Sequence, residues 1–262
     1  MSEEATTERV EIPARTAEGT PGHIDAKIFR PRGGGVSGAG PWPAVVFYMD
    51  GLGLRPALDR LAQRIADAGY LVLQPNGYWR AGAAPAFDRE TMLVPGGPER
   101  KRLMTLIQTT VMPWAMTDFL TLAAFLDGHP DVAGRTIRTV GYCFGGRLAL
   151  AAAGVAPDRV VAAASIHGSR LTTEEEPSPM LLAPKMRAEL YLAVAERDEW
   201  HDAATTARLE KAFTEAGLRH AIELYPGTEH GFAPDDTVPY DRAASERHLA
   251  CVLALFSRHR DG

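Results

Sequence analysis

Cysteine is scarce in this sequence: only Cys143 and Cys251 occur among 262 residues. Two cysteines are too few for the disulfide framework that stabilises many small secreted domains. The first nine residues are acidic and polar, without the apolar stretch of a secretion signal. We therefore expect a cytoplasmic protein with reduced thiols.

Basic clusters and long apolar runs are also missing. The chain has 28 Lys and Arg against 33 Asp and Glu, a formal net charge of −5. Binding to nucleic acid or to an anionic membrane surface needs concentrated positive charge. No apolar run approaches the roughly 20 residues that cross a bilayer. The sequence thus predicts no nucleic-acid partner and no membrane partner.

Metal-binding motifs are absent as well. The sequence contains no His-Glu-x-x-His and no Cys-x-x-Cys pattern, which are the spacings that place several metal ligands together. We therefore expect no metal site.

What the sequence does contain is an alternation of strand-like and helix-like segments. We predict strands at 43–49, 70–74, 136–140, 160–166, 189–195 and 221–225, and helices at 56–68, 114–126, 203–216 and 240–258. Alternation of this kind gives a mostly parallel, doubly wound sheet with helices on both faces, the α/β class. With 45% hydrophobic residues, residues 1–262 can form one large domain.

Several segments lie outside this alternation. Residues 1–22 are expected to form an N-terminal arm and an edge strand, with 9–13 and 23–31 as antiparallel edge strands. Residues 33–40 are glycine-rich and predict a loop, and 78–98 predict a long surface excursion. Residues 171–187, with three acidic residues in a row and three prolines, are expected to form a mobile flap.

The most informative segment surrounds Cys143. A β-branched run is followed by Gly141-Tyr142-Cys143-Phe144-Gly145 and then by an alanine-rich helix pattern. This order of strand, sharp turn and helix is that of a nucleophile elbow, which lifts one side chain above the sheet. The alternative is that Cys143 is only a small buried hydrophobic residue, the commonest fate of a free cysteine.

Two later residues complete a catalytic constellation with Cys143. Asp198 and His230 each follow a predicted strand, and the chain order nucleophile, acid, histidine is that of α/β-hydrolases. We expect His230 to act as the base for Cys143 and Asp198 to orient the imidazole. Residues that compete for the acid are Glu196, Glu199 and Asp202, and residues that compete for the base are His167 and His201.

An oxyanion hole is expected beside the nucleophile. It would use the backbone N–H of Phe144 and that of Gly51, in the loop after the strand at 43–49. Asp50 precedes Gly51, and a carboxylate there would disfavour the thiolate of Cys143 by repulsion between like charges.

These motifs resemble the dienelactone hydrolase (carboxymethylenebutenolidase) family. The resemblance rests on residues 141–146, on Glu196-Arg197-Asp198 and on 225–233, and extends over roughly residues 25–256. It implies an α/β-hydrolase fold, a monomer or weak homodimer, and no cofactor. It further implies a Cys-His-Asp triad that opens small lactones or activated esters through a thioester, and an acidic residue, here Asp50, that pairs with the resting thiol.

The chain departs from the family's type members at two places. They carry His-Glu where this chain has Met49-Asp50, and they place an arginine after the catalytic histidine where this chain has Pro234. Arg80 resembles a second arginine of the family that binds the substrate's carboxylate. The residues expected to contact substrate are Asp50, Leu52, Tyr78, Arg80, Tyr142, His167 and Trp200.

The function predicted from the sequence is hydrolysis of a small-molecule lactone or activated carboxylic ester. An acyltransferase or thioesterase would use the same acyl-enzyme with another acceptor or acyl donor. A catalytically inactive hydrolase fold that binds a small ligand is the alternative outside enzymes.

Overall fold

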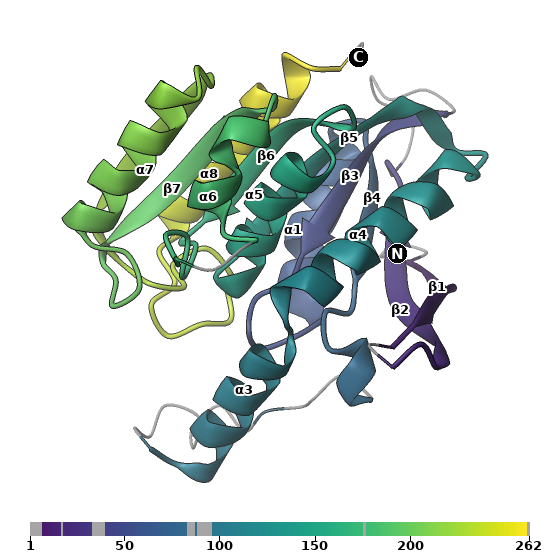
Figure 1. Cartoon of the computed structure of the whole chain (residues 1–262), viewed down its shortest axis with the longest axis horizontal. Coiled ribbons are helices and arrows are strands. Elements are labelled where there is room, and N and C mark those ends of the chain that lie inside the picture. Colours follow the sequence, from purple (N-terminus) through teal and green to yellow (C-terminus); the bar gives the residue numbers. More distant parts are fainter. Residues whose placement is uncertain are drawn as a thin grey trace.

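The computed structural model describes residues 7–16, 18–32, 40–82, 87, 96–174 and 177–260. The predicted N-terminal arm before residue 7, nearly all of the predicted loop at 33–40 and most of the predicted excursion at 78–98 lie outside these residues. Within them, strands and helices alternate along the chain, as the hydrophobic pattern predicts (Figure 1).

Eight strands form one mixed sheet in the order β1-β2-β4-β3-β5-β6-β7-β8. They are β1 (Glu8–Arg15), β2 (Pro21–Phe29), β3 (Trp42–Tyr48), β4 (Leu71–Pro75), β5 (Val132–Tyr142), β6 (Val160–Ile166), β7 (Glu189–Arg197) and β8 (His220–Glu229). β1 and β2 pair in antiparallel fashion and form one edge, and β2 also lies antiparallel to β4. The other neighbours are parallel, which confirms the predicted mostly parallel sheet.

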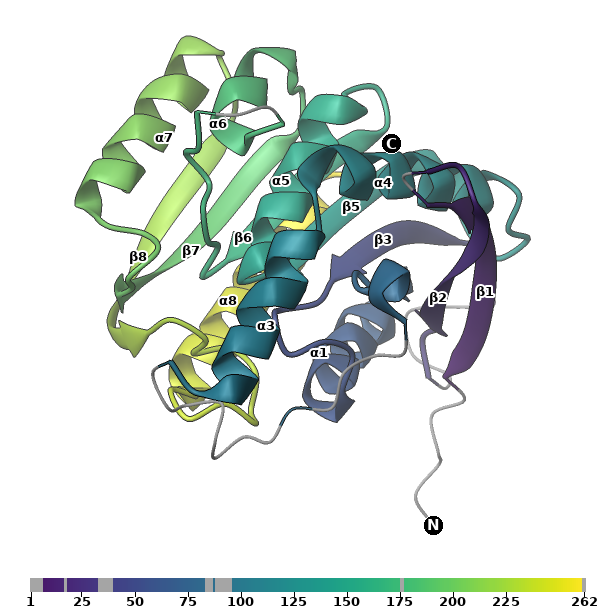
Figure 2. The ribbon, with the colours of Figure 1, turned by 60° about the horizontal axis from the view of Figure 1, so that its bottom comes forward.

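Helices cover both faces of the sheet. One face carries α1 (Pro56–Asp67) and α8 (Arg242–Ser257), which are joined by the ion pair of Arg64 with Glu246 (Figure 1). The other face carries α4 (Met112–Asp127), α5 (Phe144–Val155), α6 (Pro179–Leu182) and α7 (Ala203–Glu215). The fold is that of an α/β-hydrolase, as predicted. Figure 2 shows the β1–β2 edge and the β8–α7 edge on opposite sides of the molecule.

The core lies between the sheet and these two layers. Central strands are buried on both faces, so β3 reads as a continuous apolar run in place of an alternating one. Small side chains in β6 and α5, such as Ala163 and Ala152, are fully buried. They allow helix α5 to approach the sheet closely, and this close approach fixes the position of the turn between β5 and α5.

One helix lies outside the two layers. α3 (Pro98–Thr109) projects from the body of the molecule before the chain enters α4 (Figure 1). The sequence interpretation did not identify this helix, because none of its residues is buried and its apolar pattern is weak. Within the described segments no single helix is long and apolar enough to cross a membrane, and α3 and α4 meet that condition only as a pair bent by 66°.

The described part of the segment at 171–187, which was predicted to form a flap, packs on the body of the molecule. It contains α6 and the short helix η2 (Ala183–Lys185), and Leu182 and Ala183 are buried against the core. Burial of these apolar side chains holds the segment to α5. α3 lines the cavity at the carboxyl end of the sheet.

Candidate active site

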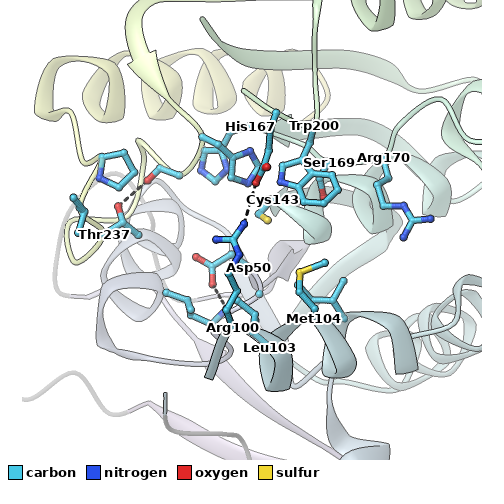
Figure 3. A pocket seen from close by; sticks show the side chains of 18 of the residues that line it. Asp50, Arg100, Leu103, Met104, Cys143, His167, Ser169, Arg170, Trp200 and Thr237 are labelled. Atoms are coloured by element: carbon cyan, nitrogen blue, oxygen red, sulfur yellow. Dashed lines mark hydrogen bonds and ion pairs between the residues drawn. The ribbon is translucent and has the colours of Figure 1, made fainter. Parts of the chain in front are cut away.

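The turn between β5 and α5 has the strained geometry of a nucleophile elbow. Cys143 has φ 55° and ψ −122°, a backbone conformation that residues other than glycine rarely adopt. Glycine is required on both sides, because a Cβ at Gly141 would overlap the carbonyl of Gly145, and a Cβ at Gly145 would overlap that of Met49. The half-buried thiol therefore stands at the end of the sheet, in the wall of a cavity (Figure 3).

The structure brings Asp198 and His230 to the same place. Nδ1 of His230 lies 2.8 Å from Oδ2 of Asp198, and the Asp198 side chain is fully buried. The other carboxylate oxygen of Asp198 accepts the N–H of Trp200 at 2.9 Å, and the N–H of His230 donates to the carbonyl of Arg197. These bonds fix the acid between β7 and the loop after β8, and they leave Nε2 of His230 as the ring nitrogen that can serve Cys143.

The charge state of His230 depends on that neighbour. Burial by itself lowers the pKa of His230, but the nearby Cys143, followed by Asp198, more than offsets burial and raises the pKa to about 10. By strict geometry Nε2 has no hydrogen-bond partner within the described residues, and the charge of Cys143 outweighs its hydrogen bond as a cause of the raised pKa. A protonated His230 places positive charge beside the thiol of Cys143.

Tyr78 contacts both Gly51 and Phe144, the two residues expected to supply the N–H groups of the oxyanion hole. The hydroxyl of Tyr78 donates to the carbonyl of Gly51 at 2.9 Å, and its ring stacks on Phe144 with 5.6 Å between centroids. In the described structure neither the N–H of Gly51 nor that of Phe144 has a hydrogen-bond acceptor. Tyr78 was predicted to contact substrate, but it is buried outside the cavity and acts as a support.

Asp50 lines the cavity beside Cys143, but its carboxylate is held by another residue. Arg55 donates to Oδ1 and Oδ2 of Asp50 at 2.5 and 2.7 Å, and the N–H of Leu52 donates to Oδ1 at 2.9 Å. The same guanidinium binds Asp236 at 2.8 and 3.1 Å. Cys143 is not among the hydrogen-bond partners of Asp50. The negative charge that the sequence places beside the thiol is therefore shared with a buried arginine.

His167 is the second histidine of the cavity. It is buried, has φ 38° and packs edge-to-face on His230 at 5.2 Å. Neither ring nitrogen has a hydrogen-bond partner among the described residues. Burial, together with the positive charges of His230 and His248, lowers the pKa of His167 well below its usual value. His167 is therefore a neutral ring and cannot replace His230, which alone contacts Asp198.

The cavity has a volume of about 330 Å³ and a largely apolar wall. Of the residues expected to contact substrate, Leu52, His167 and Trp200 line it. Other lining residues come from segments that the sequence interpretation did not assign to the site, namely Leu103, Met104 and Ile107 of α3 and residues 236–239 (Figure 3). The i, i+4 spacing of Leu103 and Ile107 after Gly97-Pro98 was the signal that could have revealed α3.

Two predicted contacts to substrate are wrong. Arg80 lies outside the cavity and donates to both oxygens of Asp118, at 2.5 and 2.8 Å, while its guanidinium stacks on Trp79. Tyr142 is fully buried, and its hydroxyl pairs with Nε2 of His248 at 3.2 Å. An alternating strand pattern could not show that Tyr142 points to the α8 face, away from the thiol.

The competing acids and the competing base have other partners. Asp202 caps α7 by accepting the N–H of Thr205, and Glu196 accepts the N–H of Gly227. Glu199 forms an exposed ion pair with Arg100. His201 bonds Thr206 through Nε2 at 3.0 Å. Asp198 and His230 are thus the pair that the fold places against Cys143.

The chain is similar to known proteins of one family. The model of the Dienelactone hydrolase family matches residues 24–260. A Synechocystis sp. protein provisionally named carboxymethylenebutenolidase is 28% identical over 221 residues, covering 83% of this chain and 86% of that protein. Carboxymethylenebutenolidase 1 of Cupriavidus pinatubonensis is 26% identical over 219 residues, covering 84% and 87%. A Klebsiella pneumoniae crystal structure, provisionally identified as a dienelactone hydrolase, superposes with a TM-score of 0.80 at 22% identity, covering 96% and 98%.

Proposed function

Since this chain belongs to the dienelactone hydrolase family and is a hydrolase of lactones or esters, we propose that Cys143, His230 and Asp198 carry out the reaction as a catalytic triad. The observation that supports this most directly is the 2.8 Å bond between Nδ1 of His230 and the fully buried Asp198. It aligns the imidazole so that Nε2 remains for the thiol in the cavity wall.

In the acylation step, Nε2 of His230 holds the proton of Cys143, and the thiolate attacks the substrate's carbonyl carbon. The carbonyl oxygen becomes an oxyanion stabilised by the N–H groups of Gly51 and Phe144. When the tetrahedral intermediate collapses, the C–O bond to the alkoxide breaks, the alkoxide takes the proton from His230, and a thioester remains. In a lactone the new hydroxyl stays attached to the acyl group.

Deacylation reverses these roles. His230 removes a proton from water, the hydroxide attacks the thioester carbonyl, and the C–S bond breaks. The products are a carboxylic acid and a regenerated thiolate beside the imidazolium. The apolar wall of α3 suits a small carbon skeleton and limits the access of bulk water to the thioester.

An acyltransferase or a thioesterase would use the same acyl-enzyme, because fold and triad fix the chemistry while the loops select the substrates. A catalytically inactive ligand-binding protein is the remaining alternative. The strained backbone of Cys143 argues against it, because strain at a single nucleophilic side chain is retained where function needs it.

A panel of lactones and short aryl esters tests the proposal on the wild type, Cys143→Ala and Cys251→Ala in parallel. We expect turnover, with a burst of aryl leaving group, in the wild type and in Cys251→Ala, and none in Cys143→Ala. Equal turnover by Cys143→Ala would refute the triad. Product analysis with added alcohols or amines separates hydrolysis from acyl transfer.

A further inference from the structure

Three large apolar side chains line the cavity without belonging to the protein core. Leu103 and Met104 come from α3, and Trp200 follows β7. All three are half-buried. Within the described residues none of them is part of the hydrophobic core or packs against it, whereas Ile107 of the same helix does pack against it. Apolar surface that is gathered in a cavity and left uncovered by the fold indicates a binding site for an apolar group.

These side chains lie on two sides of the nucleophile. In Figure 3, Trp200 is drawn on one side of Cys143, and Met104 and Leu103 are drawn on the other. An acyl group attached to the sulfur of Cys143 would therefore extend between an indole ring and two aliphatic side chains. Methionine adapts its shape to the group that it contacts, because its side chain is unbranched and flexible. The arrangement suits a carbon chain that is held by contact area.

The α3 wall also touches the predicted oxyanion loop. A Cβ added at Gly51 would lie 3.1 Å from Cδ1 of Ile107 and 3.2 Å from Cδ1 of Leu103. The three heavy atoms nearest to this position belong to Leu103 and Ile107, and none belongs to Met104. Leu103 therefore touches both the cavity and the backbone whose N–H is expected to stabilise the oxyanion. None of the residues of α3 is buried, so an apolar ligand would add to the contacts that hold this helix against Gly51.

We propose that Leu103, Met104 and Trp200 bind an apolar acyl chain of about four to six carbons, and that this chain, through Leu103, holds Gly51 in place for the oxyanion. This assignment rests on the proposed function, since the chain belongs to the acyl group that Cys143 carries. The acyl group is assigned and not the alcohol, because only the acyl group is present in both acylation and deacylation, and Gly51 serves both steps. The cavity volume of about 330 Å³, at the lower end for ligand sites, sets the limit on chain length.

The test uses the 4-nitrophenyl esters of acetate, butyrate and hexanoate, which differ only in the length of the acyl chain. For the wild type we expect kcat/KM to rise about threefold per methylene, the gain from burying one such group. We expect kcat to rise about tenfold from acetate to hexanoate, since a well-placed oxyanion donor contributes about 10²–10³. A parallel series of phenyl acetates that carry a 4-methyl, 4-propyl or 4-pentyl group lengthens the leaving group instead, and it should show no comparable rise.

Leu103→Ala should lower the hexanoate-to-acetate ratio of kcat/KM about tenfold and should also remove the rise in kcat, because Leu103 contacts both the chain and Gly51. Met104→Ala and Trp200→Ala should lower the ratio of kcat/KM but keep the rise in kcat. Leu103→Met, which conserves volume, should keep both. The matched control is Leu120→Ala, which removes an exposed leucine of α4 outside the cavity and should change neither. Since no residue of α3 is buried, the substitutions in α3 do not threaten folding.

A wild type whose kcat/KM does not depend on acyl length would overturn the subsite, and so would an unchanged ratio in the Leu103, Met104 and Trp200 alanine variants. An equal rise in the phenyl acetate series would place the chain on the alcohol side and refute the assignment. A rise in kcat that survives in Leu103→Ala would refute the role of Gly51. These results are separate from the test of the triad: if Cys143→Ala hydrolysed the acetate as well as the wild type, the proposed function would fail, whereas loss of the length dependence alone concerns only the subsite.

Discussion

Arg55 binds Asp50 through two hydrogen bonds, at 2.5 and 2.7 Å, directly beside the predicted oxyanion loop. The guanidinium also holds Asp236, which lies 181 residues later in the sequence and lines the same cavity. One buried cation thus joins the loop after β3 to the segment between β8 and α8. The positive charge of Arg55 explains why the carboxylate of Asp50 is tolerated next to the thiol of Cys143.

Arg55→Gln is expected to lower the free energy of unfolding by about 3–5 kcal/mol, because it leaves two buried carboxylates without this guanidinium. The side chains of Arg55, Asp50 and Asp236 are about one-tenth exposed, at 11%, 7% and 12%. Urea unfolding measures the change. Arg60→Gln is the matched control: its ion pair with Asp235 is exposed, so its loss should cost less than about 1 kcal/mol. Equal effects of the two variants would contradict the structural role of Arg55.

Asp50→Asn is expected to speed alkylation of Cys143 by iodoacetamide at neutral pH by about threefold to tenfold. The substitution removes a negative charge near the thiolate and leaves Arg55 bound to Asp236. Hydrolysis should become slower, because the loop that carries Gly51 loses the bonds from Arg55. Asp236→Asn is the control, since it weakens the hold on Arg55 but keeps the charge at position 50. Identical alkylation rates in wild type and Asp50→Asn would show that Asp50 does not influence the thiol.

Mass mapping in the same experiment should locate the label on Cys143. Cys251 is partly buried on α8, with its sulfur 3.8 Å from a carboxylate oxygen of Glu223. Partial burial limits the access of iodoacetamide to this sulfur, so Cys251 should react slowly. Modification of Cys251 with survival of activity would defeat both assignments.

His230 is expected to keep its proton to about pH 10 in the wild type, whereas Cys143→Ser should lower the pKa of His230 by more than one unit. The reason is that a serine hydroxyl supplies no negative charge in this range. An NMR titration of the imidazole C–H signals measures the shift. His220, whose pKa is raised through the Leu218 carbonyl and Glu210 in spite of partial burial, should titrate identically in both proteins.

The same pKa predicts how stability changes with pH. Below about pH 6.5 His230 is protonated in folded and unfolded chains alike, and its contribution to stability is complete. Between about pH 6.5 and 10 only the folded chain retains the proton, so the contribution declines as the pH rises. A wild type whose unfolding free energy, relative to Cys143→Ser, stays constant over this range would contradict the charged pair.

His230→Ala should abolish turnover. Asp198→Asn should reduce kcat about 10⁴-fold and leave measurable residual activity, since the substitution disturbs the tautomer of His230 but retains the base. His201→Asn should keep far more activity, because the His201 ring bonds Thr206. Steady-state kinetics on one activated ester measures all three variants. A His201 variant as inactive as His230→Ala would show that the base has been assigned wrongly.

The sequence by itself determined the features that depend on local pattern and chain order. Alternating strands and helices were enough for the parallel sheet, because a parallel strand needs a crossover helix and both faces must be covered. Gly141 and Gly145 around Cys143 were enough for the turn, since only residues without a Cβ fit there. The positions of Asp198 and His230 after two later strands followed from the rule that carboxyl ends of parallel strands meet at one edge.

Only the tertiary structure decided which charges meet and which way side chains point. Arg80 pairs with Asp118, and Arg55 joins Asp50 to Asp236, which comes from a segment far away in the chain. The sequence could not show that Tyr142 faces α8, because the two faces of a strand cannot be distinguished until the layers are in place. The wall that α3 forms likewise exists only where separate segments pack together. Pairings between distant segments depend on the whole fold, and local sequence pattern carries no record of them.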